Sequence, residues 1–207
     1  MNQKTTILIA DDHAVVRMGL AALFSSERDF AVIGQSSDGE NAVRDVNQLR
    51  PDIVIMDLVM PKMDGVAATD AIHRRHPDIK IIILTTFGIS DGIARALEVG
   101  ASGALLKTSD GAELIKTIRG VLQGQTMISD DVRRLFANDP PAQGLTPRQL
   151  QVLEGMARGL SNGEIARQLD IRIDGVKQHV IAILAKLGAA NRTEAVAIAM
   201  RKQLLKI

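Results

Sequence analysis

The chain has 207 residues, of which 46% are hydrophobic and 24% are charged, so it can form one large or two smaller packed domains. It contains no cysteine, which excludes disulfide bonds and thiolate metal sites. No apolar run approaches the ~20 residues that span a bilayer, and residues 1–4 lead directly into a predicted strand without a signal-peptide pattern. We therefore expect a cytoplasmic protein with no membrane partner.

The net charge of +1 conceals an uneven distribution along the chain. From residue 145 to the end there are ten Lys or Arg against five Asp or Glu, whereas the preceding part has fifteen against nineteen. A basic module meets the minimal electrostatic requirement for binding nucleic acid, although solvated basic surfaces are also common. The distribution indicates two parts with different partners, and charge alone leaves DNA binding open.

In the first 124 residues, short apolar runs alternate with segments of helical periodicity. Ser37 and Glu40 are predicted to form a capping box for the second helix. Repeated βα units imply a parallel sheet with helices on both faces and right-handed crossovers. We predict an α/β domain over residues 1–124, with a five-stranded doubly wound parallel sheet. The predicted strands are residues 6–10, 30–34, 53–56, 79–84 and 103–106.

Acidic, hydroxyl and ammonium side chains that could act together in one reaction lie at the ends of four of these strands. In open α/β sheets, ligands bind at the carboxyl ends of strands, although a single terminal Asp is also a common turn cap. Clustered carboxylates with room for water favour Mg²⁺ over zinc, and one of them can act as a nucleophile toward a phosphoryl group. Lys and Thr would then stabilise the phosphoryl oxygens. The residues concerned are Asp11, Asp12, Asp57, Thr85 and Lys107.

In these five residues and their spacing, residues 4–123 closely resemble the receiver domain of two-component response regulators, which has a flavodoxin-like fold. The resemblance implies that Asp57 accepts a phosphoryl group from a phosphohistidine on a sensor histidine kinase. It also implies Mg²⁺ bound by Asp12, Asp57 and the backbone carbonyl of Val59, with Asp11 assisting through water. A phosphatase acting on external substrates is disfavoured, because no second acid or base is placed for turnover. We expect no enzyme.

One position departs from the receiver pattern. Members of the family usually carry Tyr or Phe two positions before the last apolar residue of the fifth strand, where its ring changes rotamer during signalling. Ala104 stands at that position here, and Phe87 is the candidate to take over part of that role. The phosphorylation chemistry is thus better supported than the usual signalling switch.

Helical periodicity fades over residues 125–144, which we predict to be an interdomain linker with a possible short helix over residues 129–136. Residues 145–207 then show four helical segments. The first is capped by Thr146 before Pro147, and the second begins with a capping box of Ser161 and Glu164. Two short helices joined by a tight turn in a basic domain indicate a helix-turn-helix.

The motifs of this second domain resemble the LuxR-type DNA-binding domain, and the whole chain resembles a NarL/FixJ-type response regulator. They are Leu145-Thr146-Pro147-Arg148, Gly159-Leu160-Ser161-Asn162, Glu164-Ile165-Ala166, Val176-Lys177, His179, Lys186-Leu187 and Asn191-Arg192-Thr193-Glu194-Ala195-Val196. The resemblance implies a transcription factor that binds double-stranded DNA as a homodimer. On the outward face of the third helix, Lys177 can reach a phosphate or guanine, and Gln178 suits adenine. The expected DNA-binding residues are Lys177, Gln178, Ile181, Asn162 and Arg192.

Three residues of the third helix weaken this expectation. Gly175 removes a hydroxyl that could hold a phosphate, Asp174 adds negative charge, and Ile181 stands where a polar or basic residue is usual. An exposed Ile can contact a thymine methyl group or another protein. The alternative function is therefore a protein-interaction module or phosphoryl acceptor whose second domain does not read DNA.

Overall fold

The computed structural model describes residues 4–86, 90–141, 144–202 and 204–205. The chain divides into two compact units, Met1–Asp139 and Pro140–Ile207. The predicted role of Phe87 concerns a residue outside the described ranges.

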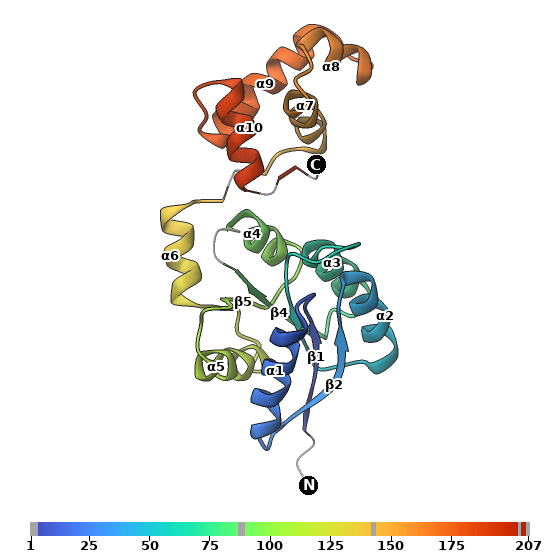
Figure 1. The fold of residues 1–207 in the computed structure, drawn as a ribbon, viewed down its shortest axis with the longest axis vertical. Coiled ribbons are helices and arrows are strands. Elements are labelled where there is room, and N and C mark those ends of the chain that lie inside the picture. The colour runs from blue at the N-terminus through green and yellow to red at the C-terminus, as the bar shows by residue number, and fades with distance from the viewer. Residues whose placement is uncertain (1–3, 87–89, 142–143, 203, 206–207) are drawn as a thin grey trace. The chain divides into compact units, whose positions relative to one another are not determined.

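A parallel sheet forms the centre of the first unit (Figure 1). Its strand order is β2-β1-β3-β4-β5-β6, and every neighbouring pair is parallel. The strands β1, β3, β4 and β5 are almost wholly buried at their carboxyl ends, which agrees with the unbroken apolar runs of the sequence. The strands are β1 (Thr5–Ala10), β2 (Phe30–Ser36), β3 (Ile53–Met56), β4 (Lys80–Thr85), β5 (Gly103–Leu106) and β6 (Met127–Ile128).

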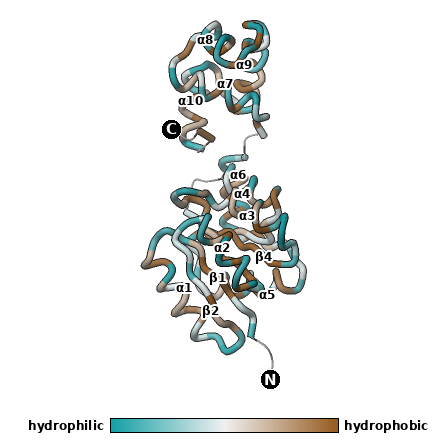
Figure 2. Tube along the Cα trace, turned by 90° about the vertical axis from the view of Figure 1, so that its right-hand side faces the viewer, coloured by the Kyte–Doolittle hydropathy of each residue, from teal (hydrophilic) through white to brown (hydrophobic). Residues whose placement is uncertain are grey.

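Helices cover both faces of this sheet, as predicted for a doubly wound fold. Hydrophobic residues from α2, α3, α4 and α6 share one core cluster with the sheet, and those from α1 and α5 share a second on the other face. In Figure 2 hydrophobic colouring follows strands such as β4 through the interior of this unit. The helices are α1 (Ala14–Ser26), α2 (Gly39–Leu49), α3 (Gly65–Arg75), α4 (Ser90–Glu98), α5 (Gly111–Leu122) and α6 (Asp130–Asn138).

Strand β6 and helix α6 correct the predicted strand count and the predicted linker. Among the residues that the structure describes, the sheet has six strands rather than five, because Met127 and Ile128 pair with Gly103 and Ala104. A side chain at Gly103 would bring its Cβ within 2.9 Å of the Met127 carbonyl oxygen, so glycine permits this close pairing. Residues 125–139 thus belong to the first unit, and the boundary between the units lies after Asp139.

In the described part of the second unit, four helices pack around one hydrophobic cluster. Thr146 and Ser161 cap α7 and α8 through capping boxes with Gln149 and Glu164, and Asn191 caps α10 through the backbone amide of Glu194. The helices are α7 (Pro147–Ala157), α8 (Asn162–Gln168), α9 (Ile173–Leu187) and α10 (Arg192–Arg201). Across the described part of the chain, none of the helices combines the length and apolar character needed to cross a membrane.

Candidate functional site

The sheet brings together the residues predicted at its carboxyl edge. Asp57 directly follows β3, and its backbone amide donates to the carbonyl oxygen of Ala10 at the end of β1 (2.8 Å). The backbone amide of Lys107 likewise donates to the carbonyl oxygen of Thr85 (2.7 Å). These ladder hydrogen bonds hold the four strand ends in register, so side chains far apart in sequence meet at one edge.

The Lys107 ammonium group lies between two buried carboxylates. Its Nζ is 2.8 Å from Oδ2 of Asp57 and 2.6 Å from Oδ2 of Asp11. Asp57 and Asp11 are 4% and 2% exposed, so water can do little to stabilise their charge. The ammonium group is therefore the main compensation for two acids that repel each other.

Burial raises the pKa of the Asp57 carboxyl above its usual value, although the hydrogen bond from Lys107 acts in the opposite direction. The pKa of Lys107 is also raised: burial alone would lower it, but the hydrogen bonds to Asp11 and Asp57 prevail. Lys107 therefore stays cationic at neutral pH. A carboxylate that is poorly hydrated and close to a fixed cation is suited to attack an anionic phosphoryl group.

The hydroxyl group of Thr85 is fully buried at the same edge of the sheet. Its Oγ1 has no hydrogen-bond partner among the described residues, and a buried polar atom without a partner commonly marks a place for a ligand atom. A phosphoryl oxygen beside Asp57 would supply that acceptor.

The acidic groups at this edge fit a hard divalent cation. One ligand atom from each of Asp11, Asp12 and Asp57 lies within 4.8 Å of the others, and the exposed side of the cluster leaves room for water. Carboxylate oxygens with water as further ligands are the donor set that Mg²⁺ prefers. Val59, whose carbonyl is the fourth predicted ligand, is 45% exposed on the loop after Asp57.

His13 belongs to this cluster as well, although sequence reasoning left it out as a residue that can be cationic. Its Nδ1 lies 2.6 Å from Oδ1 of Asp12 and 3.3 Å from Oδ1 of Asp11, and its backbone amide donates to the same Asp11 oxygen (2.8 Å). His13 is the N-cap residue of α1, so the helix start places its ring beside the acids. The imidazole orients Asp12, or competes with a cation for it.

The loop after Asp57 is anchored to the start of α2. Asp38, rather than the predicted Ser37, caps α2 by accepting from the Asn41 backbone amide, and its other oxygen binds Nζ of Lys62 (2.7 Å). The Gly39 amide donates to the Met63 carbonyl oxygen (3.2 Å) in the same loop. These contacts fix the loop that carries the predicted Val59 ligand. The sequence analysis missed them because the contacting residues are far apart in the chain and no local pattern links them.

Replacing Asp38 by asparagine is expected to destabilise the first unit near neutral pH, because Asn can cap α2 but cannot pair with Lys62. The pKa of Asp38 lies below its usual 3.8, chiefly through the hydrogen bond from Lys62 and then that from the Asn41 amide. The stabilisation that the Asp38 carboxylate gives to the folded unit is thus complete above about pH 3.8, and it is lost as the pH falls through the lowered pKa of Asp38.

Urea unfolding of both proteins, followed by far-ultraviolet circular dichroism, tests this expectation across that pH range. The difference between wild type and Asp38→Asn should be constant at neutral pH and should shrink in acid. A difference that persists unchanged below the lowered pKa would contradict the assigned ion pair.

The second unit presents the predicted DNA-binding face of α9 to solvent. Lys177, Gln178 and Ile181 are all exposed, while Val176 and Ile183 of the same helix are buried. Lys177 Nζ forms an ion pair with Oδ1 of Asp174 (3.0 Å). Since both partners are exposed, this pair contributes little stability and can be exchanged for a phosphate contact.

Asn162 and Arg192, the other two predicted DNA contacts, bind each other. Arg192 Nη1 donates to Oδ1 of Asn162 (3.3 Å), and its Nη2 donates to the carbonyl oxygen of Leu160 (2.5 Å). These bonds join the starts of α8 and α10, and Asn162 is half-buried there. The structure thus gives the pair a role in holding the helices together.

Comparison with known proteins matches both units to families. Residues 7–119 match the response regulator receiver domain, and residues 143–199 match the luxR family of bacterial regulatory proteins. The transcriptional regulatory protein LiaR of Bacillus subtilis is 42% identical over 207 residues, which cover 96% of this chain and 98% of LiaR. The chain is a LuxR-family response regulator.

Further relatives extend over the full length of this response regulator. The response regulator protein VraR of Staphylococcus aureus is 35% identical, with 97% of this chain and 98% of VraR covered. A solved structure of RcsB from Salmonella enterica serovar Typhimurium, bound to promoter P1flhDC in the presence of the phosphomimetic BeF3−, matches this chain with a TM-score of 0.73. The two sequences are 25% identical, and the match covers 96% of this chain and 99% of the RcsB chain. With a receiver and a LuxR-family domain in one chain, the protein is a DNA-binding response regulator.

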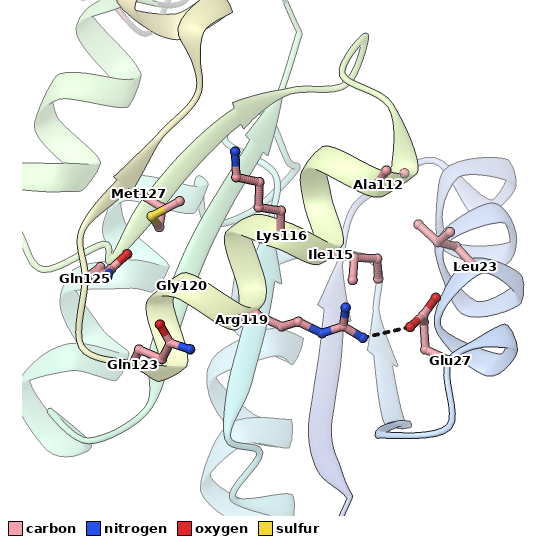
Figure 3. A pocket seen from close by; sticks show the side chains of 11 residues that line it. Leu23, Glu27, Ala112, Ile115, Lys116, Arg119, Gly120, Gln123, Gln125 and Met127 are labelled. Carbon is pink, nitrogen blue, oxygen red and sulfur yellow. Dashed lines mark hydrogen bonds and ion pairs between the residues drawn. The ribbon is translucent and has the colours of Figure 1, made fainter.

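A large hollow in the first unit lies away from this site. It has a volume of about 640 Å³ and lies between α1, α5 and β6, where Arg119 pairs with Glu27 (2.9 Å) (Figure 3). Its lining includes neither Asp57 nor Lys107. The hollow is thus separate from the candidate site at the strand ends.

Proposed function

We propose that Asp57 is the phosphoacceptor through which a sensor histidine kinase controls the DNA binding of this response regulator. The observation that carries the proposal is the buried arrangement of Asp57 and Asp11 around the Lys107 ammonium group, next to the hydroxyl of Thr85. In the reaction, an Asp57 carboxylate oxygen attacks phosphorus, the bond from phosphorus to the donor imidazole nitrogen breaks, and the histidine leaves as neutral imidazole after taking up a proton.

Each side chain at the sheet edge has a part in this transfer. Lys107 neutralises charge on the phosphoryl oxygens, and the Thr85 hydroxyl donates a hydrogen bond to one of them. Asp11, Asp12, Asp57 and the Val59 carbonyl would hold Mg²⁺, which supplies further charge neutralisation when bound. With these roles, the protein acts as a stoichiometric acceptor and a regulator rather than as an enzyme that turns over external substrates.

We propose that the kinase contacts α1, which begins beside the site. Val15 and Met18 are 81% and 69% exposed, one helical turn apart, and they follow closely after His13 of the acidic cluster. Exposed hydrophobic side chains grouped next to a reacting carboxylate suit a protein surface that delivers the phosphoryl group.

Incubation with acetyl phosphate and MgCl2 tests the acceptor directly. Intact-mass spectrometry should show one added phosphoryl group of about 80 Da, mapping to the peptide that contains Asp57. Asp57→Asn should take up none. An adduct that maps to another residue, or one that persists in Asp57→Asn, would contradict the assignment.

For the second unit, we propose that α9 contacts DNA through Lys177 and Gln178, with the chain binding as a homodimer in the cytoplasm. Replacement of Lys177 by alanine should weaken binding to all DNA sequences and reduce the salt slope of log K by about 1, because one phosphate contact is lost. Asp174→Asn is the matched variant in the opposite direction: it removes a negative charge that repels phosphate and frees Lys177, so affinity should rise.

Fluorescence anisotropy of a labelled DNA duplex over a series of salt concentrations measures both effects. Equal affinities and salt slopes in all three proteins would instead favour a protein-interaction role for the second unit.

A further inference from the structure

His13 lies at the edge of the acidic cluster with one ring nitrogen close to two carboxylates. It is the N-cap residue of α1, but its side chain makes no capping hydrogen bond within this fully described helix. Its Nδ1 instead lies 2.6 Å from Oδ1 of Asp12 and 3.3 Å from Oδ1 of Asp11. The imidazole ring therefore has no part in starting the helix, and its nitrogen is placed where the two acids would bind a cation.

These three atoms are spaced like neighbouring ligands of one transition-metal ion. Zinc binds histidine nitrogen and carboxylate oxygen at about 2.0–2.2 Å, so two ligands of a tetrahedral zinc ion are about 3.3–3.5 Å apart. The distance from Nδ1 to the Asp11 oxygen is 3.3 Å. The shorter distance to Asp12 can lengthen through a small rotation of its side chain, because Asp12 is exposed.

The Lys107 ammonium group contacts the other oxygen of Asp11. Its Nζ binds Oδ2 of Asp11, whereas Oδ1 accepts the backbone amide of His13 (2.8 Å) and faces the His13 ring. An ionised carboxylate oxygen has lone pairs for more than one partner. His13, Asp12 and Asp11 thus offer one nitrogen and two oxygens on the side away from Lys107. Three protein ligands with water as the fourth are the usual set of an open zinc site.

We propose that His13 is a nitrogen ligand that makes this site bind Zn²⁺ in preference to Mg²⁺. This inference rests on the metal site proposed above for the acidic cluster. Imidazole nitrogen suits zinc, whereas Mg²⁺ binds oxygen ligands and keeps several waters, so His13 adds affinity for Zn²⁺ alone. Because both ions would use Asp11 and Asp12, Zn²⁺ displaces Mg²⁺ from the site beside Asp57.

The metal affinities of the full chain test this proposal in wild type, His13→Ala and His179→Ala. Competition with a chromophoric chelator measures Zn²⁺ binding, and isothermal titration calorimetry measures Mg²⁺ binding. His13→Ala should bind Zn²⁺ about tenfold or more weakly, while its Mg²⁺ affinity should not fall. His179→Ala is the matched control, since this histidine lies in α9 of the second unit, outside the acidic cluster. It should match wild type for both ions.

Nitrogen-15 NMR of the histidine rings shows whether His13 binds the ion directly. The chain has four histidines, so comparison of wild type with His13→Ala assigns the His13 signals. Saturating Zn²⁺ should shift the Nδ1 signal of His13 far more than saturating Mg²⁺ does, and the ring signals of His179 should stay in place.

Two outcomes separate this proposal from the proposed function. If wild type and His13→Ala bind Zn²⁺ equally, and Asp57 is still phosphorylated with acetyl phosphate and Mg²⁺, the zinc ligand is overturned and the proposed function stands. If Zn²⁺ affinity depends on His13 but wild type shows no adduct on Asp57, the zinc ligand stands and the phosphoacceptor role of Asp57 is overturned.

Discussion

Replacing Lys107 by alanine should slow phosphoryl uptake by Asp57 from acetyl phosphate by about 100-fold or more, which is typical for loss of one preorganised charge-stabilising group. Lys107 Nζ contacts both Asp57 and Asp11, so its removal leaves two buried acids facing each other without the ammonium group between them. The pKa of Asp57, already raised by burial, should then rise further, and less of the nucleophilic carboxylate would be present.

Lys116→Ala provides the control for the loss of a cation from the same domain, because Lys116 lies on the exposed side of α5. Its rate of phosphoryl uptake, measured by intact mass against time, should equal that of wild type. If Lys107→Ala is phosphorylated as fast as Lys116→Ala, Lys107 has no role in phosphoryl transfer to Asp57.

Replacing Gly65 by alanine is expected to destabilise the first unit by about 3 kcal/mol, near the upper end for overpacking. An added Cβ would lie 2.0 Å from the carbonyl oxygen of Asp57 and 2.9 Å from the Cα of Leu58. Both are backbone atoms, so no change of side-chain rotamer can relieve the clash. The loop after the phosphoacceptor would have to move, because the Gly65 amide also donates to the Leu58 carbonyl oxygen (2.9 Å).

Gly19→Ala is the matched substitution, since a methyl group added to this residue of α1 would meet no heavy atom within 4 Å. It should stabilise the protein by about 0.5–1 kcal/mol through helix propensity. The slowest-exchanging amides of β1 and β3 report the free energy of unfolding for both variants. Equal protection in Gly65→Ala and wild type would show that the loop tolerates displacement.

The sequence predicted the parts of the site that depend on strand ends. Asp11, Asp57, Thr85 and Lys107 each follow an apolar run typical of an interior strand, and parallel pairing brings such ends to one edge. The same logic predicted the exposed face of α9, because the burial of Val176 and Ile183 follows directly from helical spacing.

The other features of the fold and the site depend on contacts between residues that no local sequence pattern predicts. Strand β6 has only two residues, too few for any periodicity, and it exists because Gly103 lets Met127 approach β5. The capping role of Asp38 was assigned to Ser37, since two adjacent residues with capping side chains cannot be separated by pattern alone. Its ion pair with Lys62 joins two loops that meet only in the folded domain.

The most direct test of phosphorylation-controlled DNA binding is to sequence the genomic DNA fragments that the purified full chain retains, with and without beryllofluoride and Mg²⁺. Wild type should enrich a shared sequence motif far more strongly with beryllofluoride than without it, and Asp57→Asn should give the weaker pattern under both conditions. Identical enrichment by wild type and Asp57→Asn under both conditions would contradict the control of DNA binding by Asp57.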